Sequence, residues 1–246
     1  MNKLIIDINC DVGEGLENEA ELFPFISRCN IACGGHAGDE KTIRDVVRLA
    51  KSYQIKIGAH PSYPDKENFG RKVLDIDNDL LEQSLVYQIS TFKAIAEQEN
   101  VEIDHLKPHG ALYNEVAKNE KLALMVIDVL KRILPGVKLM APYHSVIAKQ
   151  AALQKIELIF EGFVDRNYEE DLSLVSRNKP NAIIAQKEKA LDHVVRMAKG
   201  KVVTVTGKEK KIRASSFCIH GDHKNTLEIL QYLYEKMPEQ GIYISK

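Results

Sequence analysis

The sequence has no excess of charge of either sign and no long apolar run, and both absences restrict its function. Its 34 Lys and Arg residues nearly balance 35 Asp and Glu residues, which gives a formal net charge of −1. Such a chain has no overall field to attract nucleic acid or an anionic membrane. No apolar run approaches the ~20 residues that span a bilayer. Asp7 and Asp11 interrupt the stretch where a signal peptide needs continuous apolar residues. We therefore expect a cytoplasmic protein that binds neither nucleic acid nor membrane.

Cysteine is also scarce, and one nucleotide-binding motif is absent. The four cysteines, at positions 10, 29, 33 and 218, form no CxxC pair, which argues against a structural zinc site. We expect reduced thiols that serve as small buried residues. The sequence contains no GxxxxGK[ST] phosphate-binding loop. The chain alone is therefore not expected to hydrolyse ATP.

What the sequence does contain is a repeated alternation of strand-like and helix-like segments. Apolar residues recur at helical spacing over 43–53, 81–96 and 122–133. The β-rich runs between such segments are Leu4–Cys10, Cys29–Cys33, Ile55–His60, Ile103–Lys107, Val137–Ala141, Ile156–Phe160, Val202–Val205 and Phe217–His220. Repeated β–α units predict a parallel sheet covered by helices. Because no linker divides the 246 residues, we expect a single β/α-barrel domain over 1–246.

The faces of the predicted strands favour a barrel over an open sheet. Successive strand side chains point to opposite faces. In the strand over 4–11, one face is apolar, and the other carries Asp7, Asn9 and Asp11 toward the carboxyl end. Parallel strands covered by helices are usually apolar on both faces. A face that turns polar at its carboxyl end is typical of a barrel whose open mouth holds a site.

The other predicted strands repeat this trend. Lys107 and His109 share a face at the end of one strand, and Asn30 shares its parity with His36 beyond another. Further polar side chains end the remaining strands, at His60, Glu161 and His220. Any single histidine here is as readily a structural residue as a functional one. Their recurrence at strand ends predicts that these positions carry the chemistry.

Several motifs at these strand ends resemble the LamB/YcsF family. They are "DINCDVGEG" at 7–15, "NIACGGHAGD" at 30–39, "GAHPSYPD" at 58–65, "FGR" at 69–71, "KPHGALYN" at 107–114, "EGFVDRNY" at 161–168 and "CIHGD" at 218–222. The resemblance covers about the whole chain. It implies an α/β fold, an irregular seven-stranded (β/α) barrel of the glycoside hydrolase/deacetylase type. It also implies ATP-dependent opening of 5-oxoproline to L-glutamate, in which separate subunits B and C take part and the complex consumes ATP.

This chemistry needs a base for water, donors for a developing oxyanion and a cation for the substrate carboxylate. The predicted catalytic residues are Asp11, His60, Lys107, His109 and Glu161. The predicted substrate-binding residues are Asn9, Asn30, His36, Arg71, Tyr113, Asn114, Asp165, Arg166 and His220. Lys107 has a competing interpretation as half of a buried ion pair with Asp7 or Asp11. Arg166 also has a competing interpretation, as the ion-pair partner of acids near Asp165. His193 and His223 are expected on the surface.

Two other functions remain open from the sequence. One is a metal-dependent deacetylase or amidohydrolase, in which Asp11, His36 and His60 form a carboxylate–His–His site. Asp11, His36 and His60 show no HxxxH or HxH spacing among themselves, so we expect no tightly bound catalytic ion, although the sequence leaves a bound metal undetermined. The other is a non-catalytic binding subunit, which has no evident need for so many ionisable strand ends. A homo-oligomer is compatible with either.

Overall fold

The fold is a closed barrel of parallel strands, described in a computed structural model over residues 3–16, 18–222 and 224–245. Within these residues, seven parallel strands close on themselves because β1 pairs with β2 on one edge and with β9 on the other. In barrel order they are β1 (Leu4–Val12), β2 (Arg28–Ala32), β3 (Lys56–His60), β4 (Ile103–Leu106), β5 (Lys138–Pro142), β6 (Leu158–Phe163) and β9 (Ser216–His220). The α/β barrel with seven strands that the resemblance implies is confirmed.

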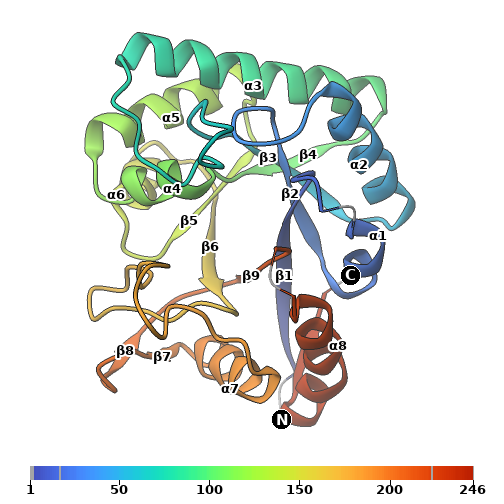
Figure 1. Cartoon of the computed structure of the whole chain (residues 1–246), viewed down its shortest axis with the longest axis vertical. Helices are drawn as coiled ribbons and strands as arrows, with labels where there is room; N and C mark the ends of the chain where they lie inside the picture. Colours follow the sequence, from blue (N-terminus) through green and yellow to red (C-terminus); the bar gives the residue numbers. More distant parts are fainter. Residues whose placement is uncertain (1–2, 17, 223, 246) are drawn as a thin grey trace.

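Helices surround the barrel (Figure 1). They are α1 (Glu19–Leu22), α2 (Glu40–Ser52), α3 (Asn78–Gln98), α4 (Gly110–Val116), α5 (Glu120–Ile133), α6 (Val146–Leu153), α7 (Lys187–Ala198) and α8 (Thr226–Lys236), with 3-10 turns η1 (Phe23–Phe25) and η2 (Met237–Gln240). Side-chain oxygens of Asp39, Asn119 and Ser145 accept backbone N–H groups and start α2, α5 and α6. Among the described residues, no helix combines the length and apolarity needed to cross a membrane.

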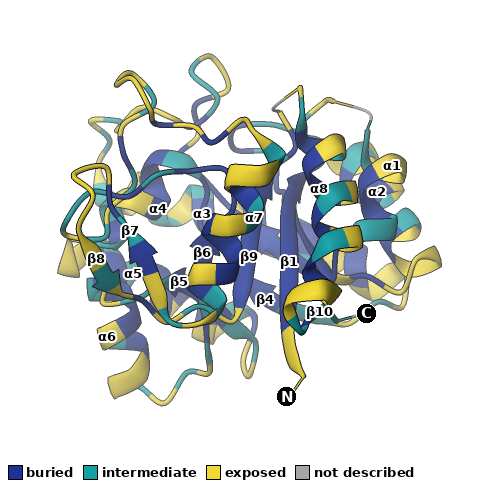
Figure 2. Ribbon diagram, turned by 90° about the horizontal axis from the view of Figure 1, so that it is seen from below, coloured by how far each residue is buried: buried dark blue, intermediate teal, exposed yellow. Residues whose placement is uncertain are grey.

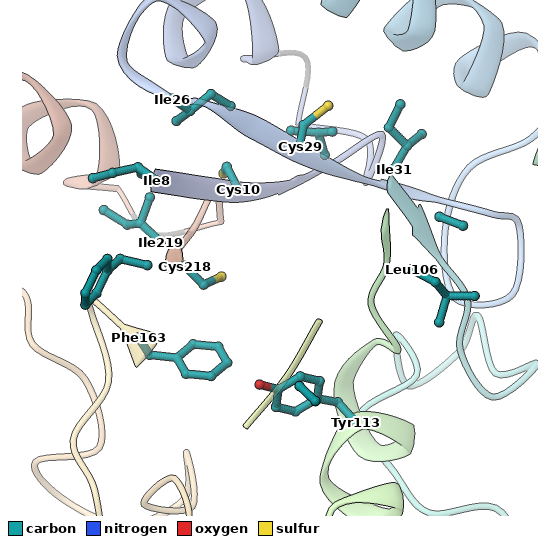
Figure 3. Close-up of a cluster of buried hydrophobic side chains, with 14 of the residues drawn as sticks. Ile8, Cys10, Ile26, Cys29, Ile31, Leu106, Tyr113, Phe163, Cys218 and Ile219 are labelled. Atoms are coloured by element: carbon teal, nitrogen blue, oxygen red, sulfur yellow. The ribbon is translucent and has the colours of Figure 1, made fainter. Parts of the chain in front are cut away.

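The two faces of the barrel strands differ as their sequences predict. Ile8, Cys10 and Ile31 are buried on the outer face, in the apolar layer between strands and helices (Figures 2 and 3). The inner face carries Asn9 and Asn30, both 0 % exposed. Buried polar groups require hydrogen-bond partners, so this inner layer is a connected network that positions the site. All four cysteines are free and buried, as expected.

One predicted strand lies outside the barrel. The segment predicted at Val202–Val205 forms β7 (Lys201–Val203), which pairs antiparallel with β8 (Glu209–Lys211) as a separate ribbon. Lys201, Glu209 and Lys211 are exposed, whereas a barrel strand under helices is buried on both faces. The short turn at Gly207, which has φ +82°, reverses the chain direction between β7 and β8, so the two strands pair with each other. A further strand that the sequence pattern missed, β10 (Ile242–Ile244), extends the sheet beside the first residues of β1.

Candidate active site

A cavity of about 650 Å³ opens at the carboxyl ends of the barrel strands. Of the residues predicted from the sequence, those that line it are Asp11, His60, Arg71, Lys107, His109, Tyr113, Asn114, Arg166 and His220. The other predicted residues lie outside this lining and contact it, or one another, from behind. They are Asn9, Asn30, His36, Glu161 and Asp165. The fold therefore brings the predicted residues together in two layers.

Lys107 stands between two carboxylates at the floor of the cavity. Its Nζ lies 2.9 Å from Asp11 Oδ1 and 2.9 Å from Glu161 Oε1, and it donates to Cys218 Sγ at 3.2 Å. Burial disfavours the ammonium form, but the negative charges of Asp11 and Glu161 outweigh it and hold the pKa of Lys107 well above its usual value. The site thus contains a permanent buried cation. The ion pair with Asp11 that the sequence left open is present.

Two asparagines of the inner layer hold the Asp11 carboxylate in position, Asn30 directly and Asn9 through Asn30. Asn30 Nδ2 donates to Asp11 Oδ1 at 2.7 Å and to Asn9 Oδ1 at 2.8 Å, while Asn9 Nδ2 donates to Ser216 Oγ. Although burial opposes ionisation, His60 and then Lys107 hold the pKa of Asp11 well below its usual range. Asn9 and Asn30 therefore orient the carboxylate. The alternative partner of Lys107, Asp7, lies deeper and pairs with Arg28 at 2.7 Å.

Three buried oxygens near Lys107 have no assigned hydrogen-bond partner among the described residues. They are the Tyr113 hydroxyl and the two carboxylate oxygens of Glu161, whose Oε1 contacts the Lys107 ammonium group. Burial, and then the charge of Glu161, raise the pKa of Tyr113 well above its usual value, so its hydroxyl keeps the proton. Tyr113 and Phe163 point toward one another with ring centroids 5.8 Å apart (Figure 3). The Tyr113 hydroxyl is thus a protonated donor at the cavity wall, close to Glu161.

Asp165 fixes the protonation of His220. The Nδ1 atom of His220 lies 2.9 Å from Asp165 Oδ2, which also accepts the backbone N–H of His220. Burial opposes ionisation of Asp165, but His220 outweighs it and lowers the pKa of this carboxyl. A carboxylate can only accept, so Nδ1 carries the proton and Nε2 keeps its lone pair. His220, which lines the cavity, can therefore accept a proton from water or substrate.

The mouth of the cavity is cationic. Arg71 donates to Asp222 Oδ2 at 2.5 Å, and Arg177 lies 3.4 Å from the same oxygen. Lys72 also lines the cavity. Three cations thus lie at the mouth, and one carboxylate, Asp222, contacts two of them, which favours an anionic ligand. Sequence reasoning did not select Arg177, Lys72 or Asp222 as site residues. Asp222 ends the motif at 218–222 and Lys72 follows the motif at 69–71, so these motifs were the available signal.

Arg166 and His193 hold the loop over 164–186 that forms one wall. Arg166 is buried and donates to the backbone carbonyls of Val175 at 2.5 Å and Ala182 at 3.3 Å. Its partners are thus carbonyls, not the acids considered from sequence. The expectation that His193 lies on the surface is wrong, because it is 7 % exposed on the inner face of α7. His223 lies outside the described residues.

Three histidines and Glu14 form a compact cluster beside Asp11. The rings of His36 and His109 stack with centroids 3.6 Å apart. His109 Nδ1 lies 2.9 Å from His60 Nε2, and His36 Nε2 lies 2.9 Å from Glu14 Oε1. A Cβ atom on Gly70, which has φ +61°, would lie 3.0 Å from both His109 and His36, so only glycine fits this close approach.

These residues differ from the metal-ligand set considered from sequence. One donor atom from each of Glu14, His36, His60 and His109 lies within 4.8 Å of the others. Asp11 instead belongs to a second group, with Cys218 and His220. The trio of Asp11, His36 and His60 that was considered as an alternative is therefore divided between two groups. Glu14 was not selected from the sequence, because acids near a helix start are often partners of its dipole.

Comparisons with known proteins agree with this architecture. The model of the LamB/YcsF family matches residues 6–246. The chain is 39% identical over 241 residues to the 5-oxoprolinase A subunit of Haemophilus influenzae (strain PittEE), with 98% of each chain covered. It is 35% identical over 245 residues to the Staphylococcus aureus (strain MSSA476) protein of the same name, covering 97% of this chain and 98% of the other.

A solved structure gives the same result for the fold. The lactam utilization protein from Thermus thermophilus superposes with a TM-score of 0.90 at 31% sequence identity, and 99% of each chain is covered. The similarity thus extends over the barrel and its site together. The chain belongs to the LamB/YcsF family.

Proposed function

We propose that this chain is the hydrolytic subunit of an ATP-dependent 5-oxoprolinase, which opens 5-oxo-L-proline to L-glutamate together with separate partner subunits. The names of its full-length relatives support the reaction class. The observation that carries the proposal is the arrangement of two groups in one cavity. These are the buried cation of Lys107 and a His220 whose accepting nitrogen is set by Asp165.

The cavity matches an activated lactam better than a neutral one. The amide of 5-oxoproline is a poor electrophile, and ATP-dependent phosphorylation of the lactam oxygen by the partner subunits would activate it. The activated ring then carries a phosphate and a carboxylate. Arg71, Lys72 and Arg177 at the mouth supply the complementary charge. The chain accepts this ring and admits water.

Each residue near the floor has a role in this scheme. His220 Nε2 takes a proton as water adds to the ring carbon, and the proton passes to the ring nitrogen as the C–N bond breaks. Lys107 and the Tyr113 hydroxyl stabilise the oxyanion. A second water then hydrolyses the acyl phosphate to glutamate and phosphate. Asp11 and Glu161, predicted as water-activating acids, contact Lys107, so here they hold the cation in place.

Reconstitution tests the proposal. The chain is purified alone and with candidate B and C subunits, and glutamate release from 5-oxoproline and ATP is measured. Release is expected only when all subunits are present. A His220→Gln chain in the same complex should lose release while ATP consumption by the partners continues. Full release by the partners without this chain, or no release by the complete complex, would overturn the proposal.

A further inference from the structure

The protonation of two cavity histidines is fixed by backbone carbonyls. His60 Nδ1 lies 2.8 Å from the Lys107 carbonyl, and His109 Nε2 lies 3.0 Å from the Phe69 carbonyl. A carbonyl oxygen only accepts, so both of these nitrogens carry hydrogen. When both rings are neutral, the other ring nitrogens, His60 Nε2 and His109 Nδ1, carry lone pairs. These two atoms face each other at 2.9 Å.

Further acceptors converge on the same point. Glu14 Oε1 lies 3.5 Å from His109 Nδ1, and Asp11 Oδ2 lies 3.4 Å from His60 Nε2. His36 brings its Nε2 to 2.9 Å from Glu14 Oε1. Lone pairs and carboxylate oxygens repel one another unless a cation lies among them. The geometry therefore requires a positive charge, either a shared proton or a metal ion.

The surroundings favour a metal ion over a proton. His36 is 2 % exposed, and its Nδ1 has no partner among the described residues. Neutral imidazole is the form that binds metals. Ligand histidines typically donate their other N–H to a carbonyl or carboxylate, as His60 and His109 do here.

We propose that Glu14, His36, His60 and His109 form a binding site for a divalent transition metal ion of the zinc class. Three imidazoles and one carboxylate are a ligand set that suits Zn²⁺. With zinc–ligand distances of ~2.0–2.1 Å, ligand atoms around a tetrahedral ion lie roughly 3.4 Å apart. Three of the six ligand pairs lie 2.9, 2.9 and 3.5 Å apart and need only small shifts, and all six lie within 4.8 Å.

The fold explains why this site has no compact sequence motif. His60 is the last residue of β3, and the other three ligands follow the ends of β1, β2 and β4. These four strands are neighbours in the barrel. Each strand contributes one ligand, so the spacing in sequence is set by the helices between strands. His60 and His109 also line the cavity, so the ion would form part of its wall beside Asp11. The inference does not depend on the proposed function.

Metal binding by the chain alone tests the inference. Chelator-treated protein is titrated with ZnCl₂ by calorimetry and with CoCl₂ by visible absorption. We expect about one ion per chain, a dissociation constant of micromolar or below, and a cobalt spectrum typical of low-symmetry N/O coordination. Zinc should also raise the melting temperature, because it binds only the folded chain.

Variants locate the ion. Glu14→Gln and His36→Gln should each weaken zinc binding at least ~10²-fold, and circular dichroism checks that they fold. Glu14→Gln keeps the size of a side chain that is 5% exposed, so this variant serves if the histidine variant fails to fold. His144→Asn removes an exposed histidine and should bind zinc normally. Cys218→Ser, in the second group, should do the same.

Two results would overturn the inference. One is a wild-type chain that takes up no zinc or cobalt, which would assign a shared proton to the His60–His109 pair. The other is folded Glu14 and His36 variants that bind zinc as tightly as wild type, which would place the ion elsewhere.

Discussion

Lys107 Nζ lies 2.9 Å from Asp11 Oδ1 and so joins the end of β4 to the end of β1 across the barrel interior. Both residues are buried, at 2 % and 5 % exposure. Glu161 approaches the same ammonium group at 2.9 Å. One cation therefore compensates two buried carboxylates, and each acid depends on it. Removal of the lysine affects the fold and the chemistry through the same contacts.

Lys107→Met is expected to reduce both stability and turnover. It leaves Asp11 and Glu161 without their cation, and breaking a buried pair from one side costs about 3–5 kcal/mol. Turnover in the reconstituted complex should fall ~10²-fold or more, the scale of losing one oxyanion donor. Urea unfolding and glutamate release, measured on one preparation, check both effects.

The matched control is Lys118→Met. This lysine pairs with Glu115 on the surface, where its side chain is 69% exposed, so stability should change by less than about 1 kcal/mol. A Lys107 variant of low stability but normal rate would contradict the catalytic role. One as stable as wild type would contradict the account of the ion pair.

Asp165→Asn should impair catalysis more than binding. An amide can donate to His220 Nδ1, which moves the ring proton to Nε2 and removes the accepting nitrogen. We expect kcat to fall by ~10²–10⁴-fold, the usual contribution of a general base, with little change in KM. Steady-state kinetics of the complex measure this, and Asp171→Asn, on the same loop, is the control. A raised KM at unchanged kcat would assign Asp165 to binding.

Two substitutions at the cationic mouth are expected to change KM in opposite directions. Arg177→Gln should raise KM for the activated anionic ring by ~10-fold, because an interaction common to ground and transition states is lost. Asp222→Asn should lower KM, since it frees Arg71 and Arg177 from their shared carboxylate. Both effects should weaken at high salt. Equal KM values in the two variants would show that the mouth does not bind this ring.

The sequence predicted the barrel and the inner wall of the site, because strand parity places Asp11, Lys107 and His220 at one mouth. It could not predict partners that depend on loops. Arg177 and Asp222 meet across distant segments, and Glu14 joins the histidines only when β1 lies beside β2. The error at His193 has a similar cause, since residue type suggested exposure while α7 packs this face inward.

The chain alone is expected not to hydrolyse ATP. Its sequence lacks a GxxxxGK[ST] loop, and the cavity mouth supplies arginine and lysine side chains in place of a glycine-rich phosphate cradle. Phosphate release from ATP by the purified single chain should stay at the level of a buffer blank, with or without 5-oxoproline. Robust ATP-dependent ring opening by the single chain would remove the need for partner subunits.

His193 makes the stability of the chain depend on pH. Burial lowers the pKa of this histidine to about 4 from its usual 6.5. The folded chain therefore holds it neutral between these values, while the unfolded chain binds one more proton. Its contribution is fully present above pH 6.5 and is lost as pH falls toward 4. The full loss is on the order of 3 kcal/mol.

Removing this titration should flatten the pH dependence of stability. The free energy of unfolding is measured in urea at pH 7.5 and pH 5.0 for wild type, His193→Asn and the exposed-site control His144→Asn. Acidification should cost wild type and the control roughly 2 kcal/mol more than the His193 variant, since about 1.5 pH units of the titration lie in this interval. Other buried groups, such as His105, act equally in all three chains and cancel. An equal loss in all three would mean that His193 is protonated in the folded chain.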